Sequence, residues 1–278
     1  MKPIQAFTDP GGRIIPSILS FSAADPTCGS GLHADILTIA ALGGMPLGVT
    51  TSVVIQSTAL FEGLLSIDDD WIADQARAVL EDIPVHAFKV GTLGSVESIV
   101  AVAEVLSDYP DIPVVYDPAL MLGSNDPLAD EDFLATLGEL LLPQTAIITP
   151  SLAEARSLVQ EEDEDDAPLS AADCARRLLE LGCGHVLISG RHDQAAQIVN
   201  TLYGPGGIIR TDAWERLPGV FHGAGSTQSA ALATYLAQGI AMFDAVYLAQ
   251  RYTWDALAQG TRPGMGKSLP NRFPTKPA

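Results

Sequence analysis

Short apolar segments alternate with segments of helical periodicity along most of this chain, and this alternation constrains the fold more than any other feature. Strand-like runs occur at 17–22, 49–55, 87–90, 114–116, 146–149 and 185–188. Helical spacing of apolar residues occurs at 32–42, 69–80, 96–106, 130–141, 152–159 and 171–181. Repeated β-then-α order builds a parallel sheet with helices on both faces, so we predict an α/β protein.

The pattern changes in the last third of the chain. The segments 198–202 and 207–212 flank a Gly-Pro-Gly-Gly turn and predict a hairpin, and two longer helices are expected at 226–238 and 243–259. No repeat or linker divides the chain, so residues 15–278 are expected to form one domain after a loose arm at 1–14. The acidic run 161–166 is interpreted as a solvated loop between helices.

Composition limits the partners and the compartment. Hydrophobic residues make up 47% of the 278 residues and charged residues 18%, which is typical of a folded globule. The net charge of −19 repels phosphate backbones and anionic lipids, so neither nucleic acid nor a membrane is expected as a partner. The three cysteines have no metal-binding spacing, and the first fifteen residues hold no signal-like apolar stretch, so we expect a cytoplasmic protein.

Two glycine segments lie where strands turn into helices. The first runs from Asp25-Pro26 through Gly29 and Gly31 to Asp35, and a structural turn explains it about as well as a ligand loop. The second runs from His222 to Thr227 and leads into an apolar helix. Its consecutive amides can form an anion hole, although Ser226 can equally be an ordinary helix N-cap.

Two acidic residues follow other predicted strands. Asp117 comes directly after the apolar run 114–116, and Glu154 lies just after Thr149-Pro150. Carboxylates at the carboxyl ends of parallel strands can hold Mg²⁺ for phosphoryl transfer. Glu154 can equally be a first-turn acid of a helix.

Taken in order from about Ile15 to Phe273, these segments resemble the hydroxymethylpyrimidine/phosphomethylpyrimidine kinases. The stretch 24–35 resembles that family's SDPSGGAGIQAD segment, and 52–58 resembles its ALVAQNT segment. Other matching segments, in the family's order, are 89–93, 114–120, 126–128, 142–144, 148–150, 223–231, 264–266 and 270–273.

The resemblance implies a ribokinase-like three-layer α/β/α fold with a central, mostly parallel sheet. It also implies phosphorylation of hydroxymethylpyrimidine, and then of its monophosphate, in thiamin biosynthesis. The phosphoryl donor would be ATP with Mg²⁺, and the protein would be a homodimer.

The resemblance further assigns roles to single residues. Asp35 and Gln56 would hydrogen-bond the aminopyrimidine, with Gly31, Thr92 and Ala119 beside it. A carboxylate and an amide suit a ring that carries an amine and ring nitrogens. The other implied roles are an anion hole of Gly223, Ala224, Gly225 and Ser226, a Mg²⁺ site at Asp117 and Glu154, and nucleotide contacts at Ser189, Gly190, Arg191 and Thr227.

Four positions depart from the family pattern where phosphate and proton transfer should occur. Ser226 stands in place of a cysteine that is thought to take the proton from the attacking hydroxyl, and a serine is too weak an acid to act as a base unaided. Ser151 replaces asparagine, and Ser189 and Gly123 replace lysines. Phosphoryl transfer depends on positioning and charge neutralisation, so these changes predict weakened catalysis.

Three cations are candidates to replace the lost charge: Arg191, Arg210 and Lys267. We interpret His33 as a partly exposed helix residue and Cys28 as a small loop residue, each without a catalytic role.

Three functions therefore compete. The first is a working pyrimidine kinase, the second a non-catalytic sensor that binds a pyrimidine through Asp35 and Gln56, and the third a kinase for pyridoxal or a related heterocycle. The reading depends on one spatial expectation: the turn at 223–226 should face the same hollow as Asp35 and Gln56.

Overall fold

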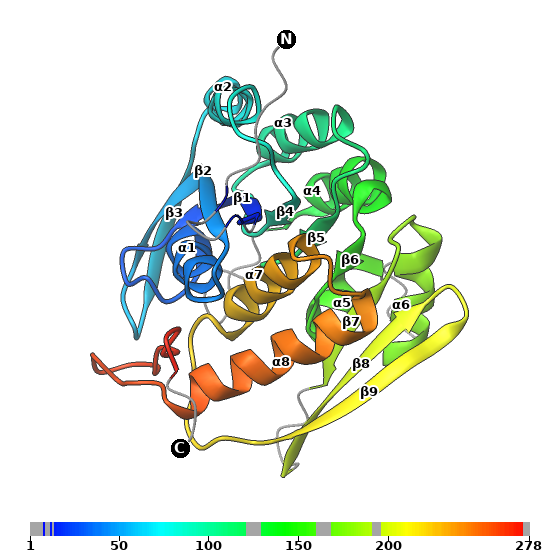
Figure 1. The fold of residues 1–278 in the computed structure, drawn as a ribbon. Helices are drawn as coiled ribbons and strands as arrows, with labels where there is room; N and C mark the ends of the chain where they lie inside the picture. The colour runs from blue at the N-terminus through cyan, green and yellow to red at the C-terminus, as the bar shows by residue number, and fades with distance from the viewer. Residues whose placement is uncertain are drawn as a thin grey trace.

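The computed structural model describes residues 8, 12, 14–120, 129–159, 168–190 and 196–274, which form a sheet flanked by helices (Figure 1). The nine strands are β1 (Ser17–Ala24), β2 (Met45–Gln56), β3 (Phe61–Ser66), β4 (Ala87–Val90), β5 (Val114–Tyr116), β6 (Ile147–Ile148), β7 (Val186–Gly190), β8 (Gln197–Gly204) and β9 (Gly207–Glu215). The helices are α1 (Gly31–Ala41), α2 (Asp69–Leu80), α3 (Val96–Ser107), α4 (Glu131–Thr136), α5 (Leu152–Val159), α6 (Ala171–Glu180), α7 (Ala224–Ala237) and α8 (Met242–Ala258).

The strand order is β3-β2-β1-β4-β5-β6-β7-β8-β9. The strands from β2 to β7 run parallel, whereas β3 at one end and β8 and β9 at the other are antiparallel to their neighbours. This order confirms the predicted α/β class with a mostly parallel sheet. Loops at the carboxyl ends of the parallel strands are where such sheets bind their ligands.

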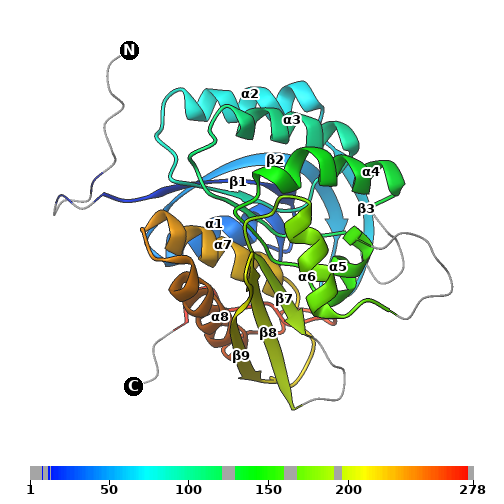
Figure 2. The same ribbon diagram turned by 90° about the vertical axis from the view of Figure 1, so that its right-hand side faces the viewer.

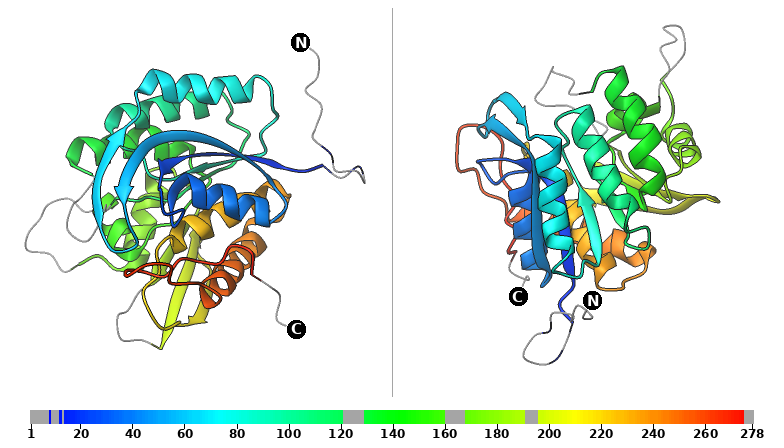
Figure 3. Two further views of the ribbon diagram at one scale, coloured as in Figure 1. Left: turned by 90° about the vertical axis from the view of Figure 1, so that its left-hand side faces the viewer. Right: turned by 90° about the horizontal axis from the view of Figure 1, so that it is seen from above.

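Helices cover both faces of the sheet, and each face has its own apolar core. Leu19 and Phe21 of β1 point into a core shared with α2, α3, α4, α5 and α6. Ile18, one residue away, points into the opposite core, which α1, α7 and α8 cover. Figures 2 and 3 show the resulting three layers, with α2, α3 and α4 on one side and α1, α7 and α8 on the other.

The sequence patterns missed one strand and simplified one helix. β3 was not predicted, and β2 begins four residues earlier than the predicted 49–55. The predicted helix 130–141 is α4 followed by a π-helical turn at Leu137–Leu141 and a 3₁₀ turn at Leu142–Gln144. Pro143 has no N–H to continue an α-helix, which accounts for the change of pitch at its end. The acidic run 161–166 lies outside the described residues.

Candidate active site

The glycine turn at the start of α7 faces a carboxylate at the end of β5. Gly223 is the N-cap and adopts a left-handed conformation with φ 87°, which lets the chain turn sharply into the helix. A side chain at Gly225 would place its Cβ 3.1 Å from Oδ1 of Asp117. Asp117 therefore lies directly beside the backbone of the turn, where the predicted anion hole and the predicted metal site adjoin.

The loop between β1 and α1 is built around the carboxylate of Asp25. Oδ1 accepts hydrogen bonds from the backbone N–H and the hydroxyl of Thr27, each 2.8 Å long, and Oδ2 accepts from the N–H and hydroxyl of Ser30. The N–H of Gly31 then donates to Oγ of Ser226 at 3.3 Å. This bond joins the two glycine segments across the sheet edge.

Asp25 also meets Gln56 and His222 in a tight triangle. Oδ2 of Asp25 lies 2.9 Å from Nε2 of Gln56 and 2.9 Å from Nε2 of His222, and the two nitrogens are 2.6 Å apart. Since Oδ2 only accepts, a hydrogen bond to each nitrogen requires both nitrogens to donate, and two donors then face each other. If Nε2 of His222 instead accepts from Gln56, its lone pair faces the lone pairs of Oδ2 of Asp25, and the two atoms repel each other. One side of the triangle is unfavourable in either case, so rotation of Gln56 toward an acceptor in a bound ring would relieve it.

Replacing Asp25 with asparagine should destabilise the fold at pH 7 by about 2–4 kcal/mol, because a carboxylate with several buried donors is lost. Burial would raise the pKa of Asp25, but the bonds from His222, Thr27 and Ser30 outweigh it and hold that pKa well below its ordinary value. A lowered folded pKa contributes stability above the unfolded value of 3.8, and the contribution is lost as the pH falls below it. Urea unfolding should therefore show the wild-type advantage shrinking between pH 7 and pH 3.

The matched control for this prediction is Asp173→Asn, at the solvent-exposed start of α6. Its pKa is also lowered, mainly by the hydroxyl of Ser170. Because that bond is exposed, the substitution should have a much smaller effect. A wild-type advantage over Asp25→Asn that stays constant from pH 7 to pH 3 would contradict the assignment.

Asp35 is enclosed by protein. Its Oδ2 forms an ion pair of 3.0 Å with Nζ of Lys89 and accepts from the hydroxyl of Ser20 at 2.7 Å, and both members of the ion pair are 0% exposed. Burial raises the pKa of the Asp35 carboxyl, while Lys89 and Ser20 oppose that rise. Among the residues that the structure describes, none forms a hydrogen bond with Oδ1. The predicted contact of Asp35 with a ligand remains a prediction, and only that one oxygen is available for it.

The predicted metal residues are two carboxylates with raised pKa values. Burial raises the pKa of Glu154 to about 7 against the bonds that its Oε2 accepts from the N–H and hydroxyl of Ser151, at 2.8 and 2.7 Å. Burial and the nearby Asp35 raise the pKa of Asp117, and Lys89 opposes them. Among the described residues no group of three or more metal-ligating side chains gathers. Two carboxylates suit Mg²⁺, since this ion keeps water and substrate phosphates as its other ligands.

The other predicted contacts lie at several carboxyl strand ends. Thr92 follows β4 and its carbonyl accepts from the hydroxyl of Thr51 at 2.7 Å, while Ala119 follows β5. Ser189 and Gly190 end β7, and Arg191 lies outside the described residues. The Thr227 hydroxyl is buried and donates to the carbonyl of Gly223 at 2.8 Å, so it stabilises the turn from inside. Their roles as substrate and nucleotide contacts stay predictions.

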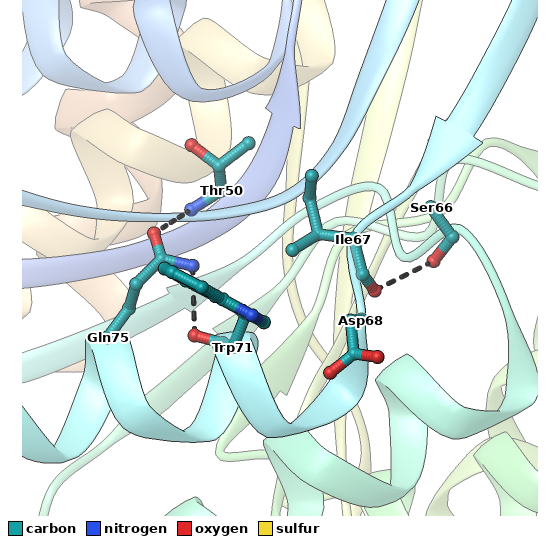
Figure 4. A pocket seen from close by; sticks show the side chains of 6 residues that line it. All are labelled: Thr50, Ser66, Ile67, Asp68, Trp71 and Gln75. Carbon is teal, nitrogen blue, oxygen red and sulfur yellow. Dashed lines mark hydrogen bonds between the residues drawn. The ribbon is translucent and has the colours of Figure 1, made fainter.

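A shallow hollow of about 520 Å³ lies apart from these groups (Figure 4). Gln75 of α2 crosses it, accepting from the N–H of Thr50 and donating to the carbonyl of Trp71. Neither the glycine turn nor Gln56 lines it. We therefore place the candidate site at the turn, where the hydrogen bonds converge, and not at this hollow.

Comparison with known proteins identifies the chain. Residues 25–271 match the family model described as phosphomethylpyrimidine kinase. The chain belongs to the phosphomethylpyrimidine kinase family. It is 34% identical over 256 residues to the hydroxymethylpyrimidine/phosphomethylpyrimidine kinase of Escherichia coli. This match covers 90% of this chain and 94% of that protein.

A second relative of this kinase-family chain is the thiamine biosynthesis bifunctional protein ThiED of Geobacter sulfurreducens, 34% identical over 257 residues. That match covers 92% of this chain but only 52% of the relative, so the chain spans about half of that protein.

Solved structures confirm the ribokinase-like fold of this kinase-family chain. The phosphomethylpyrimidine kinase of Clostridium difficile matches with a TM-score of 0.70 and 29% identity, over 86% of this chain and 97% of that one. The ADP complex of Bacillus subtilis pyridoxal kinase matches with a TM-score of 0.82 over 94% and 98% of the two chains, at 24% identity. This second likeness concerns the fold.

The two described candidate replacement cations of this kinase-family chain have different surroundings. Arg210 pairs with Asp212 and stacks on Phe243, 4.4 Å from its ring centroid, between β9 and α8. Lys267 is exposed. Arg191 lies outside the described residues. Lys267 precedes Ser268, whose carbonyl accepts from the N–H of His222 just before the turn of α7.

Sequence reasoning gave no role to four side chains that organise the site: Asp25, Lys89, His222 and Arg272. Asp25, Lys89 and Arg272 lie inside motifs that were quoted for the family resemblance, and His222 directly precedes one of them. Asp25 and His222 stand at the ends of the two glycine segments, and a short polar residue before a glycine turn was the available signal. For Lys89 and Arg272 the contacts come from distant parts of the chain, and the sequence alone carries no sign of them.

Proposed function

We propose that this protein transfers the γ-phosphoryl group of ATP to the hydroxymethyl group of hydroxymethylpyrimidine, and then to the resulting monophosphate. Membership of the family supports the reaction. The observation that carries the proposal is the bond between Gly31 and Ser226 beside Asp117, which puts the acceptor loop, the phosphate-facing turn and a carboxylate in one place.

Some residues of the site would bind the acceptor ring, and others would stabilise the charge of the phosphoryl group. Gln56, once turned from Asp25 and His222, would read the ring, and the amides of residues 224–226 would face the transferring phosphoryl group. Asp117 and Glu154 are the residues that would hold Mg²⁺, which when bound neutralises charge on the phosphates. The hydroxyl of Ser226 accepts a hydrogen bond from the N–H of Gly31 and so orients the turn. Because a serine hydroxyl is too weak a base to take a proton unaided, the proton of the acceptor hydroxyl would depart late, to product phosphate or water.

A pyrimidine sensor without turnover is the second candidate, favoured by the serine at position 226 and by the triangle that poises Gln56 for a ring. The experiment that separates the two is a coupled assay of ADP release with hydroxymethylpyrimidine and Mg²⁺-ATP, together with calorimetry of each ligand. Turnover supports the kinase, and a panel that includes pyridoxal identifies the acceptor. Pyrimidine binding with no ATP binding and no turnover would replace the kinase with the sensor.

We also propose that the protein is a cytoplasmic homodimer. Three described cysteines carry free thiols, which supports a reducing compartment, and no described helix has the length and hydrophobicity needed to span a bilayer. For the dimer, the support is the outer face of the β2–β3 hairpin. Val53 and Ile55 of β2 and Leu65 of β3 share this face and are 43%, 64% and 70% exposed, and Val53 pairs with Leu65 across the strands.

Replacing Leu65 with aspartate should therefore shift the protein toward monomer by at least tenfold in dissociation constant, because a charge would be buried in an apolar interface. Sedimentation equilibrium measures the shift. Ile208→Asp is the matched control, since Ile208 is 65% exposed on β9 at the opposite edge of the sheet. A Leu65→Asp protein with the mass of the wild type would remove this face from the interface.

A further inference from the structure

Arg272 is a buried cation that reaches the active-site loops from the C-terminal segment. It is 4% exposed. Its Nη1 donates to the carbonyl of Cys28 at 2.9 Å and its Nη2 to the carbonyl of Gly29 at 2.6 Å. Its Nε donates to Oγ1 of Thr227 at 3.2 Å. One planar group therefore fastens the β1–α1 loop to the first turn of α7.

The guanidinium lies immediately behind the phosphate-facing turn. A Cβ added to Gly223 would overlap the carbonyl of Gly29 and would stand 3.0 Å from Nη2 of Arg272. Thr227, which accepts from Arg272, donates in turn to the carbonyl of Gly223. The charge of Arg272 and the positive end of the α7 dipole thus lie at the same segment of backbone, the first turn of α7.

Within the described residues Arg272 forms no ion pair with a carboxylate, although Asp35 and Asp25 are near enough to favour its charged form. Burial lowers its pKa, and a guanidinium stays charged in proteins all the same. Carbonyl and hydroxyl acceptors leave most of that charge uncompensated. Burying such a charge costs several kcal/mol, so the fold keeps it against a stability penalty.

We propose that Arg272 is a positioning residue: it holds the β1–α1 loop against the phosphate-facing turn and supplies a fixed positive charge behind the turn of α7. The inference rests on the proposed function for the identity of the anion, a transferring phosphoryl group. Since its charge lies behind the turn of α7, removing it should weaken phosphate binding far more than ring binding.

The test is the binding of inorganic pyrophosphate and, separately, of hydroxymethylpyrimidine, measured by calorimetry on Arg272→Gln. We expect the dissociation constant for pyrophosphate to rise about tenfold and that for the pyrimidine to change less than twofold. Arg272→Lys keeps the charge and should recover most of the pyrophosphate affinity. Arg262→Gln is the matched control, because Arg262 also clamps carbonyls, of Met265 and Gly266, but in an exposed part of the same segment.

Equal losses of both ligands in Arg272→Gln would overturn the inference, since a general structural role produces that result. Unchanged pyrophosphate affinity would also overturn it, as would a wild-type protein that binds no pyrophosphate. If Arg272→Gln unfolds, the Arg272→Lys protein decides the same question. A wild type that binds pyrophosphate through Arg272 and phosphorylates no pyrimidine would reject the proposed function and keep the inference.

Discussion

Replacing Ser226 with cysteine should raise kcat for hydroxymethylpyrimidine about 100-fold. The side chain at this position accepts a hydrogen bond from the N–H of Gly31 and lies in the first turn of α7. Both the donor and the helix dipole stabilise a thiolate, which lowers the pKa of a cysteine there. A thiolate can take the proton of the attacking hydroxyl, and general base catalysis of this kind contributes factors of about 10²–10⁴.

Steady-state kinetics of the variant and the wild type with Mg²⁺-ATP measure this gain. Ser226→Ala is the control, because it removes the hydroxyl without adding a base, and its kcat should stay within a few-fold of wild type. The gain should also follow the ionisation of the thiol, so that kcat of the cysteine variant rises with pH while that of the wild type does so much less. A cysteine variant no faster than the wild type would show that proton removal does not limit the reaction.

Replacing Lys89 with methionine should lower the free energy of unfolding by about 3–5 kcal/mol, because it removes the ion-pair partner of the buried Asp35 carboxylate. For a chain of this size such a loss lowers the melting temperature by roughly 10 °C. Thermal unfolding followed by circular dichroism measures it. Lys267→Met, which removes an exposed charge, should change the melting temperature little.

The double variant Lys89→Met, Asp35→Asn provides the decisive comparison. Removing both charges should recover most of the lost stability, since a neutral pair carries a smaller desolvation cost than one unpaired carboxylate. Losses that simply add would show that the two side chains do not stabilise each other. The double variant should still lose acceptor affinity if Oδ1 of Asp35 contacts the ring.

Much of the fold follows from local patterns in the sequence. Apolar runs such as 17–22 and 114–116 form β1 and β5. Successive residues of a strand point to opposite faces of the sheet, and helices cover both faces, so a continuous apolar run is buried along its whole length. β3 escaped prediction since Gly63 and the leucines around it have weak strand preference, and the pairing with β2 supplies what the local sequence lacks.

The site was less accessible to sequence reasoning than the fold. The motifs indicated the turn at 223–226 and Gln56, because each motif is contiguous. The sequence did not indicate that Asp35 faces Lys89, since these residues meet only when β1 and β4 pair and α1 packs against them. The triangle of Asp25, Gln56 and His222 likewise exists only in three dimensions.

The bond that joins the two glycine segments spans 195 residues of sequence, and the clamp from Arg272 to Cys28 spans 244. Contacts so distant along the chain form late, because closing such long loops loses conformational entropy before the contacts stabilise the chain. A refolding chain should therefore regain its sheet, as seen by circular dichroism, before it regains phosphate binding. In a living cell, newly made or heat-stressed molecules would pass through a folded but inactive stage.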